Sequence, residues 1–185
     1  NMHRGLYRKM NLALYVLIAM VFAVLQTTIF SYFPFNYLHP DIAFIIAVYF
    51  GYRRGLIEGG IVVAFTAIVL RAHSGADQHF FMIVYMYTFL LAKLLRKIFA
   101  TRSILTSSIG MGSLLYFFKQ VAVFSLFWFD GKQDNALMHT LIHLIPGLLT
   151  QMALTPVFFA LFHRLDLLTW ADEHAEDEYD LNREF

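Results

Sequence analysis

Lys119 is the charge whose position in the sequence is hardest to explain, because it lies well inside the apolar run 104–129. A lysine at the centre of a membrane helix costs about 2.5–3.5 kcal/mol on insertion scales, so its ammonium needs a partner. We predict that it faces the helix bundle or a partner molecule, and that Asp41 is the acid with which it pairs. The pair could be purely structural, or Lys119 could make a functional contact. Three amides could complete the polar patch: Gln26, Gln120 and Gln151.

Two other sets of side chains are candidates for chemistry. Glu58 follows Arg54 by four residues, so we expect it to pair with that residue and favour a helix N-terminus, with a proton relay as the alternative. His139 and His143 share a helix face, as two metal ligands would. The metalloprotease pattern His-Glu-x-x-His is absent because residue 140 is Thr. We predict no metal site.

Motifs that would indicate an enzyme are missing from the sequence. It holds no Gly-x-Ser-x-Gly motif, no phosphate-binding loop and no pair of intramembrane carboxylates. Cysteine is absent, which excludes disulfides, thiolate metal sites and cysteine nucleophiles. We therefore predict a non-enzymatic protein without a cofactor, and with no nucleic acid among its partners.

Composition places the chain in a membrane. Of its 185 residues 59% are hydrophobic and only 15% are charged, which is too little polar surface to cover a water-soluble globule. We predict an all-α integral membrane protein whose domain, residues 1–170, is a bundle of six transmembrane helices. The predicted spans are the apolar runs 11–33, 40–52, 56–71, 80–95, 104–129 and 140–163.

The end of the sequence is strongly acidic. Eight of the 13 acidic residues lie in the last 20 positions, with Asp166 as the first of them. Such a concentration of one charge is typical of a solvated arm. We predict that residues 171–185 form a disordered cytoplasmic tail.

Run 40–52 is the uncertain span, because about 13 apolar residues are too few to cross a bilayer unaided. Lys and Arg in short loops stay on the cytoplasmic side. If the run crosses, 11 of them lie inside and 2 outside, whereas 5 lie inside and 8 outside if it does not. We predict that it crosses and that both termini are cytoplasmic. The basic residues that fix this orientation include Arg53 and Arg54, expected to reach the inner headgroups, and Arg96 and Lys97.

Small residues and prolines indicate how the helices pack. Helices approach closely where small residues recur at a spacing of four, as in Ala19-x-x-x-Ala23 and Gly55-x-x-x-Gly59, and Gly110-Met-Gly112 has the same effect. Proline in a helix interior kinks or interrupts the helix. We therefore expect a kink or a break in the last span, at Pro146 and Pro156.

The stretch 40–97 begins with PDIAFIIAVYFGYRRGLIEGG and ends with a helix that closes on LAKLLRK. It combines Pro-Asp before a short helix, a basic turn with Gly, a Gly-bearing helix, a Ser-Gly turn and a basic helix end. In these features the chain resembles the MreD family of bacterial rod shape-determining proteins. One position departs from the family pattern, since Arg71 stands where an acid is usual before the Ser-Gly turn.

The resemblance implies a scaffold of the bacterial inner membrane that helps to control cell shape and peptidoglycan synthesis. Its implied partners are MreC, bound through its transmembrane helix and juxtamembrane region, and indirectly MreB, RodA and the transpeptidase partner of RodA. Membrane lipid surrounds the bundle. On this reading Asp41, Lys119 and the Gly55/Gly59 face serve architecture and partner binding rather than turnover.

The same family is similar to the six-helix substrate-binding S components of energy-coupling-factor vitamin transporters, which supplies the alternative function. Ala19-x-x-x-Ala23 resembles the motif by which those subunits dock their transmembrane partner. A transporter subunit should enclose a small molecule among the outer loops 72–79 and 130–138. A scaffold should have a filled interior and hold another protein's helix in a groove on its lipid-facing side.

Overall fold

The computed structural model describes residues 2–28, 40–74, 80–99, 103–129 and 133–168. These residues form six α-helices and no strand, so the predicted all-α fold is confirmed for the part of the chain that is described. The helices are α1 (Met2–Thr28), α3 (Ile42–Arg53), α4 (Leu56–Ser74), α5 (Phe80–Phe99), α6 (Ile104–Phe129) and α7 (Gln133–Leu168). The predicted tail, 171–185, lies outside the described residues.

Three of the six helices are long and apolar enough to cross a membrane. The qualifying segments are Leu56–His73 in α4, Leu105–Phe129 in α6 and Thr140–Leu168 in α7. Two shorter apolar segments, Met10–Gln26 in α1 and Ile42–Arg53 in α3, accompany them. Length and composition therefore support a membrane protein with at least these candidate spans in its described part.

Helix α3 is the centre of the fold. Every residue from Ile42 to Tyr52 is buried, and α3 packs against α1, α4, α5, α6 and α7. A helix that is apolar on all sides belongs in an interior, because no face of it favours water. At 1.5 Å per residue its 12 residues extend about 18 Å, well short of a hydrocarbon layer about 30 Å thick. Other helices, rather than lipid, surround this short segment.

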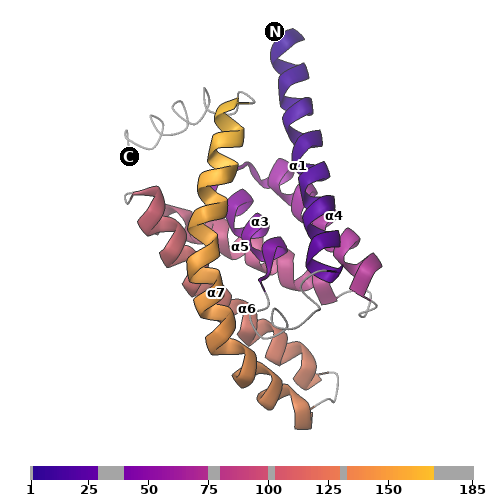
Figure 1. The fold of residues 1–185 in the computed structure, drawn as a ribbon, viewed down its shortest axis with the longest axis vertical. Helices are drawn as coiled ribbons and strands as arrows, with labels where there is room; N and C mark the ends of the chain where they lie inside the picture. The colour runs from indigo at the N-terminus through magenta and orange to yellow at the C-terminus, as the bar shows by residue number, and fades with distance from the viewer. Residues whose placement is uncertain (1, 29–39, 75–79, 100–102, 130–132, 169–185) are drawn as a thin grey trace.

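The remaining helices enclose α3, and α7 runs along most of the height of the molecule (Figure 1). The start of α1 and the end of α7 lie at the same end of the molecule, while α6 and α7 together form the opposite end (Figure 1).

Helix α1 begins at Met2 rather than at residue 11. Helix α7 continues without interruption through Pro146 and Pro156, so of the two expected outcomes the break is absent, and a kink there stays a prediction.

Glycines allow α3 and α4 to approach α5, but they differ from the predicted pair. A Cβ atom on Gly51 would lie 2.5 Å from Cβ of Ala92 and 2.7 Å from the carbonyl oxygen of Phe89. Gly59 is similarly tight against the ring of Phe89, at 2.6 Å. Gly55 is exposed, with nothing within 4 Å of its Cβ position, so the prediction of a close approach there is wrong. It lies in the turn between α3 and α4, outside any helix contact.

Candidate functional site

Polar side chains gather at the two ends of α3, and each group contains one ion pair. We call them the Asp41 cluster and the Asp166 cluster. The Asp41 cluster comprises Gln26, Asp41, Tyr85, Lys119 and Gln151. The Asp166 cluster comprises Asn11, Tyr15, Tyr49, Arg54 and Asp166.

The ion pair predicted between Asp41 and Lys119 is present in the structure. Lys119 Nζ lies 2.6 Å from Asp41 Oδ2, and the two side chains are only 12% and 9% exposed. The ammonium also lies 4.9 Å from the ring centroid of Tyr116 and 5.6 Å from that of Phe44, within cation–π range. Lys119 thus faces the interior, where the aspartate and two rings offset the loss of its hydration.

Asp41 is also the N-cap of α3. Its Oδ1 accepts the backbone N–H of Phe44 at 2.9 Å, and its two carboxylate oxygens accept the hydroxyl of Tyr85 at 3.0 and 3.1 Å. Asp and Asn are strongly favoured at this position because the first N–H groups of a helix lack partners within it. A single carboxylate therefore caps α3 and binds both α5 and α6.

Gln26 on α1 completes the cap. Its Oε1 accepts the backbone N–H groups of Ile42 and Ala43 at 3.1 and 3.3 Å, and its Nε2 donates to Asp41 Oδ1 at 3.3 Å. Unsatisfied backbone groups are costly when buried, so this amide lets the helix begin inside the protein, where Ile42 and Ala43 are buried. The sequence placed Gln26 in the polar patch, but not as a cap.

The other two predicted amides take different positions. Gln151 on α7 is fully buried and donates its Nε2 to the carbonyl oxygen of Asp41 at 3.4 Å. Gln120 instead donates to the hydroxyl of Tyr116 at 2.6 Å, so it supports the ring beside Lys119 rather than Asp41 itself. Helices α1, α5, α6 and α7 thus all donate a hydrogen bond to the residue that begins α3.

The Asp166 cluster is a finding that the sequence did not predict. Asp166 accepts the hydroxyl of Tyr15 at 2.6 Å and Arg54 Nη2 at 2.7 Å on Oδ1, and the hydroxyl of Tyr49 at 2.5 Å on Oδ2. The residue is only 5% exposed. Asp166 is therefore no part of a solvated acidic arm; it ties the end of α7 to α1 and α3.

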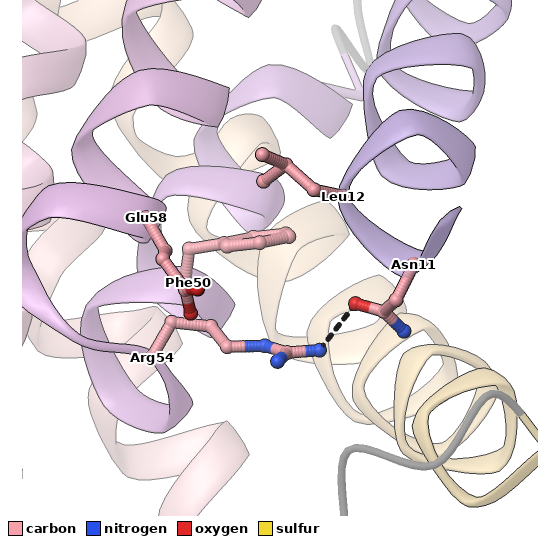
Figure 2. A pocket seen from close by; sticks show the side chains of 5 residues that line it. All are labelled: Asn11, Leu12, Phe50, Arg54 and Glu58. Carbon is pink, nitrogen blue, oxygen red and sulfur yellow. Dashed lines mark hydrogen bonds between the residues drawn. The ribbon is translucent and has the colours of Figure 1, made fainter. Parts of the chain in front are cut away.

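Arg54 was expected to reach the lipid headgroups, but in the structure its guanidinium bonds to side chains of the protein. Its guanidinium bonds to Asp166 and, at 2.7 Å, to Oδ1 of Asn11, as Figure 2 shows for the second contact. Its backbone carbonyl accepts the ammonium of Lys93 on α5. Arg53 points elsewhere, with Nη2 2.6 Å from Nδ1 of His163. Both arginines are thus engaged within the protein, whereas Lys97 in the last turn of α5 is exposed.

Glu58 and Arg54 line the same small hollow, together with Asn11, Leu12 and Phe50 (Figure 2). Glu58 lies in the first turn of α4, where a carboxylate favours the helix dipole as predicted. The ion pair that the structure gives Arg54 is with Asp166, not with Glu58. A proton relay through Glu58 stays a prediction.

The chemistry available to these clusters is limited by their separation and their hydrogen bonds. Asp41 and Asp166 occupy opposite ends of α3, roughly 20 Å apart at 1.5 Å per residue, so they form no carboxylate pair. Each carboxylate already accepts several donors. Within the described residues no three His, Cys, Asp or Glu side chains lie close enough to hold a metal ion. Each cluster is a network of hydrogen bonds and one ion pair that connects an end of α3 to the neighbouring helices.

Two hollows in the described part of the protein have volumes of about 10 Å³, beside Arg54, and about 220 Å³, beside Trp128 and Phe129 at the end of α6. Pockets for small organic ligands span about 300–1,000 Å³. The outer loops expected to enclose a transported molecule include 75–79 and 130–132, which lie outside the described residues.

Comparisons with known proteins add no further assignment. No protein-family model matched the chain, and neither the curated proteins nor the solved structures contained a significant match. Function must therefore be argued from the residues themselves and from the geometry of the two clusters.

Proposed function

We propose that this chain is a non-enzymatic scaffold of the bacterial inner membrane, of the kind that its resemblance to the MreD family implies. It would cross the bilayer six times with both termini in the cytoplasm. It would bind the single transmembrane helix of MreC, and through MreC would act with MreB, RodA and the transpeptidase partner of RodA in shaping the cell.

The observation that carries this proposal is the filled interior. A transporter subunit needs space for its substrate, whereas here the centre is occupied by α3, buried along its whole apolar length. Ion pairs hold α3 at both ends, through Lys119 and Asp166. Because these buried ion pairs hold the helices in fixed positions, the outer surface of the bundle keeps one shape, which suits the binding of another protein.

Six crossings are supported by the arrangement of the helices as well as by charge. The start of α1 and the end of α7 lie at the same end of the molecule, as an even number of crossings requires (Figure 1). The short α3 can serve as a span because protein surrounds it and because Asp41 and Gln26 satisfy its first N–H groups. Snorkelling of Arg54 is not needed.

The surface available to a partner helix differs from the one expected. Gly59 packs inside against Phe89, so the Gly55/Gly59 face does not offer a groove. Large apolar side chains are exposed on every described helix except α3, and we propose the face of α1 and α4, which lie side by side, as the one for a partner helix. The exposed side chains of this face include Leu17, Val21, Ile57, Ile61 and Ile68. A transmembrane helix and lipid compete for such a face.

The alternative, an S component of a vitamin transporter, has less support. The residues that resemble its docking motif, Ala19 and Ala23, are 0% and 2% exposed. They lie in the core of this chain, where an external subunit would not reach them.

Co-purification distinguishes the two functions. The tagged chain would be extracted from its bacterial host in a mild detergent, and bound proteins and small molecules identified by mass spectrometry. We expect a stoichiometric single-pass membrane protein with a large extracytoplasmic part. Recovery of a tightly held vitamin, without such a protein, would overturn the scaffold and favour the transporter. A variant in which Ile57 and Ile61 are replaced by Asn, paired with an Ile83→Asn control on α5, would test the α1/α4 face.

A further inference from the structure

Arg54 has a buried donor, Nε, for which the described part of the structure gives no partner. Its Nη2 donates both to Asn11 and to Asp166 at 2.7 Å. Its Nε is buried and meets no acceptor within the part of the chain that is described. Buried donors on charged groups are almost always paired, because the protein otherwise loses the hydration of the group without replacing it. We therefore expect a hydrogen-bond acceptor beside Arg54 Nε.

The small hollow beside Arg54 has the size and the lining for that acceptor. Its volume is about 10 Å³, and its walls are Asn11, Leu12, Phe50, Arg54 and Glu58. Figure 2 shows the side chains of Glu58 and Arg54 entering this region from one side and those of Leu12 and Asn11 from α1. A buried water needs at least about 10–15 Å³ and two to four polar partners. The hollow thus accommodates one water and nothing larger.

We propose that an ordered water molecule binds in this hollow, accepting the N–H of Arg54 Nε and donating to the carboxylate of Glu58. The amide of Asn11 lines the opposite wall and is a third polar group within the site. A chloride ion fits less well, because the carboxylate of Glu58 would repel it. This inference concerns the contacts that hold the helices together and does not depend on the proposed function.

This water makes Arg54 the common partner of four helices around α3. Asn11 belongs to α1, Asp166 to α7, and the bridged Glu58 to α4. The backbone carbonyl of Arg54 adds Lys93 of α5. A lysine at position 54 would not reproduce these contacts, because one ammonium lacks the fixed directions of the guanidinium donors.

The first test is an experimental structure of the purified protein at a resolution that shows ordered water. We expect density for a water at about 2.7–3.2 Å from both Arg54 Nε and a carboxylate oxygen of Glu58. A direct bond between Nε and Glu58, or an empty hollow, would overturn the proposal.

A second test uses melting temperature in detergent. Glu58→Gln and Glu58→Leu both remove the negative charge from the first turn of α4, but Gln keeps an oxygen for the water. Glu58→Leu has no oxygen there and should melt several degrees below Glu58→Gln. In an Arg54→Lys background, which lacks Nε, this difference between Gln and Leu should disappear. If the difference persists undiminished there, Glu58 does not act through Arg54 and the proposal fails.

Discussion

The carboxylate of Asp41 and the ammonium of Lys119 lie 2.6 Å apart, although 78 positions separate the two residues in the sequence. The contact joins the start of α3 to the middle of α6 inside the protein. Because both side chains are almost fully buried, removing one of them would leave the charge of the other without compensation.

Lys119→Met should therefore destabilise the protein by about 3–5 kcal/mol, since the carboxyl group of Asp41 would stay buried without its cation. The loss can be measured as the shift of thermal unfolding in detergent. A change below about 1 kcal/mol would contradict a buried pair, because that is the typical contribution of an exposed one.

Combining Lys119→Met with Asp41→Asn gives a matched control for the same pair. Asn is an equally good N-cap, so the cap of α3 survives while its negative charge is removed. We expect the double variant to be more stable than the sum of the two single losses allows, with a coupling energy of about 1–3 kcal/mol. Strictly additive losses would show that the two residues act independently.

Asp166→Asn should also destabilise the protein by about 3–5 kcal/mol, because Arg54 would then carry an unpaired buried charge. Tyr15→Phe and Tyr49→Phe each remove one hydrogen bond to that charged group and should cost about 1.5–3 kcal/mol. The control is Glu173→Gln in the predicted acidic tail, which should leave the unfolding temperature unchanged. Equal changes in unfolding temperature for Asp166→Asn and Glu173→Gln would contradict the role of Asp166 in holding α7 to α1 and α3.

Two glycines provide a test of the contact between α3 and α5. Gly51→Ala forces a Cβ atom to within 2.7 Å of the backbone of Phe89, which cannot move aside cheaply, so we expect a loss of about 1–3 kcal/mol. Gly55→Ala meets open space and should change stability by less than about 1 kcal/mol. The comparison is read from unfolding temperatures. A Gly51→Ala variant as stable as Gly55→Ala would mean that the two helices are not in close contact.

The predicted acidic tail can be tested by its effect on cell shape. If residues 171–185 are a disordered arm, deleting 172–185 should leave a rod-shaped host with normal shape and the protein with unchanged abundance. Cell shape is scored by microscopy, and abundance by immunoblot. Rounded cells at normal abundance would show that the tail binds a partner.

The sequence was sufficient to predict the ion pair of the Asp41 cluster because charges within its long apolar runs are few. Lys119 required an acidic partner, and Asp41, at the start of a short apolar run, was the plausible one. Asp166 could not be recognised in this way, because it stands first in a sequence of acids whose composition indicates a solvated segment. Only its position on the buried face of α7, opposite Tyr15 and Tyr49, distinguishes it from the others.

The glycines show a second limit of reading spacing alone. Gly51, Gly55 and Gly59 recur every four residues, but the helix ends at Arg53 and a new one begins at Leu56. The repeat therefore runs across a turn, and its middle member faces outward. Which glycine contacts a neighbour depends on where the helix ends, and the spacing of the glycines does not reveal that α3 ends at Arg53, with Arg54 in an extended conformation.

The side of the membrane on which the turn between α3 and α4 lies decides whether the chain can cross the bilayer six times. Because the chain contains no cysteine, a single Gly55→Cys substitution at this exposed, uncrowded position gives one labelling site. In cells with a permeabilised outer membrane, an impermeant maleimide should leave this site unlabelled until the inner membrane is opened, whereas an Asp130→Cys control should react at once. Labelling of Gly55→Cys from the periplasmic side would contradict the six crossings and the family resemblance built upon them.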